Sequence, residues 1–139
     1  MKKIVFTVIA FGVLLLLTGC PTPNGPTPTA VTFVSAVQTG GISDTTDSTG
    51  LILTFDIDPT TLTVDDITVT GATKGALSGT GTTRTLAISG IALANGETVS
   101  VALSSPSGFA ISGSPKTAVV YRRALSIAVT FVSAVQTGG

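Results

Sequence analysis

A stretch of twelve residues, AVTFVSAVQTGG, occurs twice in this chain of 139 residues. It spans Ala30–Gly41 and returns unchanged as Ala128–Gly139, at an offset of 98 positions. Identity over this length marks an internal repeat, and each repeat is normally one structural unit. The offset suits one small domain plus a short connector. We therefore expect one complete unit followed by the opening of a second, in an array that is either cut short or a fragment of a longer one.

The N-terminus has the pattern of a secretory signal. Lys2 and Lys3 precede the apolar run Ile4–Leu17, which is shorter than the roughly 20 residues that a membrane helix needs. The run leads into Leu-Thr-Gly-Cys, which resembles a bacterial lipobox. The resemblance implies a signal peptide over residues 1–19, cleavage between Gly19 and Cys20, and lipid on Cys20. An ordinary secretory signal with a stray cysteine, or an N-terminal membrane helix, remains the alternative.

Residues 20–29 are expected to form the lipidated cysteine and a tether. The sequence PTPNGPTPT holds a chain extended because proline restricts the backbone, and nine extended residues span roughly 25–30 Å. Pro21 follows Cys20, where many lipoproteins kept in the inner membrane of enteric bacteria have aspartate, so we expect the outer surface. Without Lys2 and Lys3 the chain has five basic and seven acidic residues. This balance argues against nucleic-acid binding, which needs a basic surface.

From Ala30 to Arg123 the chain alternates apolar and polar residues in short segments separated by glycine, aspartate and asparagine. Alternation with period two, repeated at this spacing, predicts an all-β immunoglobulin-like Greek-key sandwich of about seven strands. The one helical candidate is Pro59–Asp66, where Pro59–Leu62 is expected to form a single turn before the next strand. The core is expected to rest on aliphatic side chains together with Phe33, Phe55 and Phe109. The expected strands begin around Val31 and continue at Leu51–Asp56, Ile67–Thr70, Ala76–Ser78, Arg84–Ser89, Val99–Leu103 and Thr117–Tyr121.

The segments Leu53–Asp56, Asp65–Val69, Gly75–Leu77 and Leu86–Gly90 resemble the bacterial Ig-like repeats that occur in tandem on surface lipoproteins and cell-wall proteins. The resemblance covers residues 30–123. It implies a stalk, display or adhesive module and carries no catalytic residues. Residues 124–139 would then be a connector and the first strand of a second repeat.

Two features bear on chemistry. The chain has no histidine and a single cysteine, so histidine-assisted nucleophilic catalysis is excluded and no enzyme activity is expected. Asp56, Asp58, Asp65 and Asp66 lie within eleven residues and could contribute oxygen ligands to Ca²⁺, which takes six to eight. The simpler interpretation, which we prefer, is that Asp65 and Asp66 cap a turn while Asp56 faces solvent.

The sequence therefore predicts a membrane-anchored lipoprotein of the cell envelope whose Ig-like module has a structural, display or adhesive role. Its partners would be host or neighbouring-cell surface proteins or polysaccharide. One alternative is a receptor domain for carbohydrate or a host protein, for which Tyr121 beside Arg122 would be a candidate patch. Another is a non-functional fragment of a longer array. The apolar segment Val129–Val135 repeats the first expected strand, so we expect it to be either disordered or engaged in strand exchange, which would give self-association.

Overall fold

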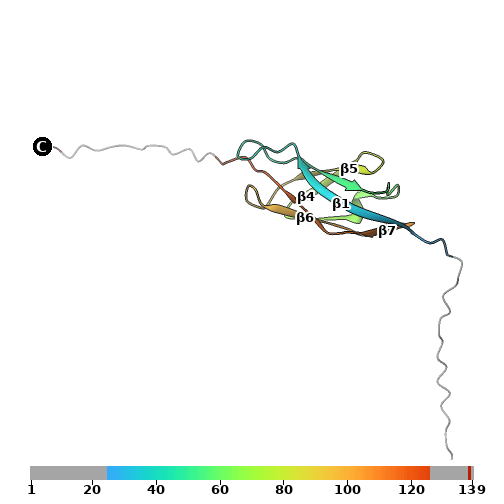
Figure 1. Ribbon diagram of the computed structural model, residues 1–139. Coiled ribbons are helices and arrows are strands. Elements are labelled where there is room, and N and C mark those ends of the chain that lie inside the picture. The colour runs from blue at the N-terminus through green and yellow to red at the C-terminus, as the bar shows by residue number, and fades with distance from the viewer. Residues whose placement is uncertain (1–24, 126–137, 139) are drawn as a thin grey trace, which may run out of the picture.

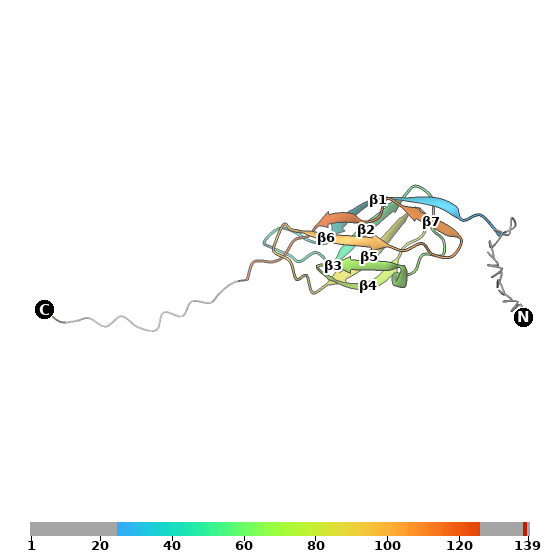
Figure 2. The same cartoon turned by 90° about the horizontal axis from the view of Figure 1, so that it is seen from below.

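The computed structural model describes residues 25–125 and residue 138. This part of the chain is an all-β, immunoglobulin-like sandwich of two sheets (Figures 1 and 2). One sheet has five strands in the order β4-β5-β2-β1-β7, and the other has three in the order β3-β6-β8. The predicted fold class is therefore confirmed. The strands are β1 (Thr29–Thr39), β2 (Gly50–Phe55), β3 (Ile67–Thr70), β4 (Thr73–Ser78), β5 (Thr83–Ser89), β6 (Thr98–Leu103), β7 (Phe109–Ser112) and β8 (Lys116–Val119).

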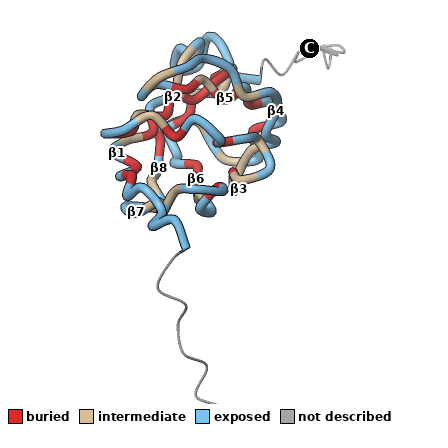
Figure 3. The backbone as a smooth tube through the Cα atoms, turned by 90° about the vertical axis from the view of Figure 1, so that its right-hand side faces the viewer, coloured by how far each residue is buried: buried red, intermediate tan, exposed pale blue. Residues whose placement is uncertain are grey.

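The core lies between the sheets and follows from the period-two alternation (Figure 3). In β2, Leu51, Leu53 and Phe55 point inward and are buried, while the residues between them are half-buried. The same alternation buries one face of β5 and β6. Burial of apolar surface stabilises a domain by about 25 cal/mol per Å². The apolar face of each strand therefore points toward the core, and this fixes the orientation of the strand. The other buried apolar residues include Val31, Phe33, Ala36, Ile67, Leu86, Ile88, Val99, Val101, Ala118 and Val120.

Strand β1 joins two different neighbours. Its first residues pair in parallel with β7, from Thr29 opposite Phe109 to Thr32 opposite Ser112. The rest pairs antiparallel with β2, and the register shifts between Phe33 and Ser35. A bulge of this kind bends the strand and lets it change partner. As a result, β1 has a hydrogen-bonded neighbour on both sides and is an interior strand of its sheet.

The structure has eight strands because β7 is not among the seven expected segments, of which the last, Thr117–Tyr121, corresponds to β8. Gly113–Pro115 separates β7 from β8, and proline has no N–H to give to a strand ladder. The alternation in β7 is weak: its apolar residues, Phe109 and Ile111, are only half-buried and pack at the margin of the core. Phe109 was expected in the core with Phe33 and Phe55. It packs against the core but is only half-buried, whereas Phe33 and Phe55 are buried.

A hydrogen bond of 2.8 Å from the N–H of Leu62 to the carbonyl of Pro59 closes a turn where one was expected, and a short 3-10 helix follows it at Val64–Asp66. Among residues 25–125 no helix is long and apolar enough to cross a membrane. Cys20, the first part of the tether (residues 21–24) and Val129–Val135 lie outside the described residues, so the lipidation site, the cleavage site and the strand expected at the second copy of the repeat remain predictions.

Candidate functional site

The described chain enters and leaves the sandwich at opposite poles (Figure 1). At the entry pole β1 begins beside Gly108, whose carbonyl accepts the N–H of Thr29 at 2.9 Å. At the exit pole the loop 40–49, which follows β1, lies beside residues 121–124, which follow β8. The two ends of β1 therefore lie at the two poles. The chain enters the domain at one end of its long axis and leaves at the other, which we call lengthwise threading.

The departing chain is held at the exit pole by a set of hydrogen bonds. Ser48 and Tyr121 exchange two of them, since Ser48 N–H donates to the Tyr121 carbonyl and Tyr121 N–H donates to Ser48 Oγ, both at 2.9 Å. Arg123 N–H donates to Asp47 Oδ1 at 2.7 Å, and Ala124 N–H donates to the Asp44 carbonyl at 3.1 Å. Ser48 is only 2% exposed, so water does not compete for the hydrogen bonds of its hydroxyl group.

Asn95 ties a third segment into the same place. Its Oδ1 accepts the N–H of Arg122 at 2.9 Å, while its Nδ2 donates to Ser43 Oγ at 2.8 Å and to Asp44 Oδ1 at 3.0 Å. One side chain thus joins the β5–β6 connection, the loop after β1 and the departing chain. We call Asp44, Asp47, Ser48 and Asn95, together with the backbone of residues 121–124, the exit clasp.

The loop that carries the clasp has a defined backbone. Gly40 has φ +78°, and a Cβ there would meet the Thr49 side chain. Asp44 also has a positive φ, of 59°, which aspartate tolerates better than most residues. Ile42 pairs with Thr46 across the loop. These features present the polar groups of the loop to the departing strand.

The structure does not bring the four predicted calcium ligands together. Asp56 Oδ1 accepts the N–H of Thr32 at 2.6 Å, Asp66 Oδ2 accepts the N–H and Oγ1 of Thr63 at 2.9 and 2.8 Å, and Asp65 is exposed. No group of three or more acidic, histidine or cysteine side chains in the described ranges is arranged to hold a metal ion. The capping role expected of Asp66 is present, and the hydrogen bond to Asp56 shows a partner that the sequence did not indicate.

The contact between Asp56 and Thr32 also sets the charge state of the carboxylate. The N–H of Thr32 donates to the ionised form, and this hydrogen bond holds the pKa of Asp56 below its ordinary value. The contact connects the end of β2 to β1 just before the bulge.

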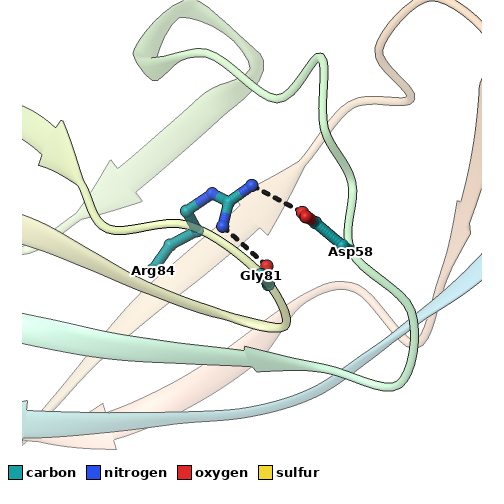
Figure 4. Close-up of polar contacts among 3 residues, drawn as sticks. All are labelled: Asp58, Gly81 and Arg84. Atoms are coloured by element: carbon teal, nitrogen blue, oxygen red, sulfur yellow. Dashed lines mark hydrogen bonds and ion pairs between the residues drawn. The ribbon is translucent and has the colours of Figure 1, made fainter.

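Within residues 25–125, one ion pair is present, and it joins Asp58 to Arg84 (Figure 4). Oδ1 of Asp58 accepts Nη2 of Arg84 at 2.6 Å, and Nη1 of Arg84 donates to the carbonyl of Gly81 at 2.6 Å. The Arg84 side chain is 7% exposed and that of Asp58 is 37% exposed. The pair thus ties the β2–β3 connection to the turn between β4 and β5.

The candidate sugar-binding patch is occupied by structural contacts. Tyr121 and Arg122 are half-buried, and Nη1 of Arg122 donates to the Leu93 carbonyl at 3.3 Å. The described part of the chain has no pocket. Phe33 and Phe55 stack on each other inside the core, with ring centroids 5.4 Å apart.

Comparison of the chain with protein-family models, with curated proteins and with solved structures finds no match.

The exit clasp was not predicted from the sequence as a unit. Asn95-Gly96 has the signature of a tight turn, and Asp44 and Asp47 look like ordinary loop acids. The available signal was the repeat itself, because its second copy begins at Ala128, five residues after Arg123. Polar residues that contact the last strand of a unit are candidates for holding the chain at that point.

Proposed function

We propose that this protein is a lipid-anchored protein of the bacterial cell surface whose Ig-like domain is a spacer and display module. The observation that carries the proposal is the lengthwise threading of the domain, with entry and exit at opposite poles and the exit held by the clasp. A module threaded in this way adds its full length to a chain that is anchored at one end.

The repeat spacing supports a close connection between successive units. Ala124 is the last residue held by the clasp, and the counterpart of Thr29, where β1 begins, is Ile127. Only Leu125 and Ser126 lie between them, and three peptide steps of 3.8 Å reach about 11 Å. A following unit would therefore sit directly against the exit pole. Ile42 and Leu125, which are 62% and 82% exposed there, offer it apolar surface.

The anchoring step rests on the lipobox resemblance around Cys20. The test is to express the full chain in a bacterial host with an alkyne analogue of palmitate and to compare it with Cys20→Ser. We expect label on the wild-type chain and none on Cys20→Ser. Equal labelling of both chains, or labelling of neither, contradicts lipidation at Cys20.

The display step is tested on intact cells. An antibody against the folded domain should stain whole cells that express the wild-type chain, and added protease should remove the staining. A periplasmic reporter serves as the control for cell integrity. Staining that appears only after the cells are permeabilised would contradict a role at the outer surface.

A further inference from the structure

We propose that the C-terminal copy of the repeat, Ala128–Gly139, is a second β1 that can take the β1 position in another copy of this chain when the resident β1 is displaced. The two copies are identical letter for letter. Whether the second copy can replace the first is therefore determined by what β1 contacts in the fold, independently of the lipid anchor.

The position that β1 occupies is specific to its sequence. Val31, Phe33 and Ala36 are 1%, 0% and 7% exposed, and Phe33 stacks on Phe55 of β2. The strand also pairs with β2 on one side and with β7 on the other. A segment that fills this position must match the inward side chains, the bulge and both registers. Ala128–Gly139 repeats Ala30–Gly41 letter for letter, so Val129, Phe131 and Ala134 are the counterparts of the buried Val31, Phe33 and Ala36.

The geometry prevents the second copy from taking the β1 position in its own domain. The clasp holds Ala124 beside Asp44, beyond the C-terminal end of β1. In the same register, Ala128 would have to lie where Ala30 lies, about 30 Å back along the strand at 3.3 Å per residue. The four peptide steps from Ala124 to Ala128 reach at most about 14 Å. While the clasp is closed, the acceptor must be another domain.

The second copy has to compete with the resident β1 for the β1 position of the acceptor domain. The resident β1 is joined to β2 by a short loop, and such a connection gives an effective concentration in the millimolar range. At micromolar protein, an identical strand from another molecule would then occupy roughly one site in a thousand. Loss of the resident β1 removes this competition, so the exchange should become the main state when β1 is disabled and the second copy is intact.

The two copies provide a matched pair of variants. Phe33→Asp places a charge in the buried β1 position and should expel the resident strand, whereas Phe131→Asp should disable only the second copy. To detect the exchanged state, we would add Thr54→Cys and Ser133→Cys to the full chain in detergent. The counterpart of Ser133 is Ser35, which faces Thr54 in the β1–β2 register. A disulfide between the two introduced thiols therefore reports the predicted register.

We expect oxidation of the Phe33→Asp chain to give a ladder of disulfide-linked dimers and larger species on a non-reducing gel. The chain with Phe33 should give roughly a thousandfold less, by the effective-concentration argument. Adding Phe131→Asp to the Phe33→Asp chain should abolish the ladder and leave an unfolded monomer. The proposal is overturned if Phe33→Asp alone is an unfolded monomer without cross-links. It is also overturned if the ladder persists after Phe131→Asp, because the contact would then not use the β1 position.

Discussion

The ion pair between Asp58 and Arg84 offers a prediction with a marked asymmetry, because the two partners differ in exposure. Arg84 is 7% exposed and Asp58 is 37% exposed. Asp58→Asn preserves the size of the side chain but leaves the guanidinium in a buried position, with the Gly81 carbonyl as its remaining hydrogen-bond partner. Arg84→Met removes the buried charge itself and keeps most of the aliphatic volume. The two substitutions therefore test different consequences of the same contact.

The magnitude follows from the environment of the pair. Removing one partner of a fully buried ion pair costs about 3–5 kcal/mol, because the other charge stays buried without compensation. Water reaches the Asp58 side of this pair, so we expect about 2 kcal/mol for Asp58→Asn. A loss of this size lowers the melting temperature of a domain of about 100 residues by roughly 8–16 °C. In Arg84→Met chains the freed Asp58 carboxylate can be solvated, so adding Asp58→Asn should change little further.

The assay is a double-mutant cycle by urea unfolding and calorimetry on the chain with wild-type, single and double substitutions at these positions. We expect Asp58→Asn to be destabilised and the double variant to match Arg84→Met within about 0.5 kcal/mol. Asp65→Asn is the matched control, since Asp65 is exposed and its carboxylate accepts no hydrogen bond from the other residues of the described range 25–125. The reasoning is refuted if Asp58→Asn is as stable as the control. It is equally refuted if the two single losses simply add in the double variant.

Three further predictions concern the strand ends, the clasp and the core. The hydrogen bond from Thr32 lowers the pKa of Asp56, so its contribution to stability should be fully present above the ordinary pKa of 3.8 and be lost as pH falls below it. Unfolding measured from pH 6 to pH 2 should show this loss in the wild-type chain and a smaller one in Asp56→Asn; identical acid profiles would count against the contact. Ser48→Ala leaves the N–H of Tyr121 without its partner and should cost about 1–3 kcal/mol, with faster hydrogen exchange confined to residues 121–124 and the loop 40–49. Unchanged exchange there would show that the clasp does not depend on Ser48. Phe55→Ala should cost about 3–5 kcal/mol because the ring is 3% exposed, and Phe109→Ala should cost less than half as much because its ring is at the core margin; equal losses would contradict the assignment of Phe109.

The strand positions could be predicted because alternation is a local property. Leu51, Leu53 and Phe55 have to lie on one face of any extended segment, and burying that face determines its orientation. The same logic located β3, β5 and β6. It failed for β7, where Phe109 and Ile111 are only half-buried and the strand depends on pairing with the start of β1. That pairing connects residues about 80 positions apart, so no local sequence pattern predicts it.

The candidate site shows the same division between local and long-range information. Asp66 and Thr63 are three residues apart, so a capping interaction between them is visible in the sequence. Asn95 and Asp44 are 51 residues apart, and Arg123 and Asp47 are 76 apart. Four nearby aspartates suggested a metal site, but Asp56, Asp58 and Asp66 contact Thr32, Arg84 and Thr63 respectively, and the first two of these contacts span 24 and 26 residues.

The sequence by itself determined the repeat, its period and the β-sandwich class, because identity and alternation can be read along one chain. The tertiary structure alone decided which strand lies between β2 and β7, where the chain leaves the domain and what holds it there. These properties depend on contacts between residues far apart in the sequence, whose geometry exists only once both sheets have packed around one core. The repeated twelve residues therefore acquire a physical meaning from the fold. The first copy is an interior strand of the five-stranded sheet, and the clasp holds the departing chain at the pole opposite the start of that strand.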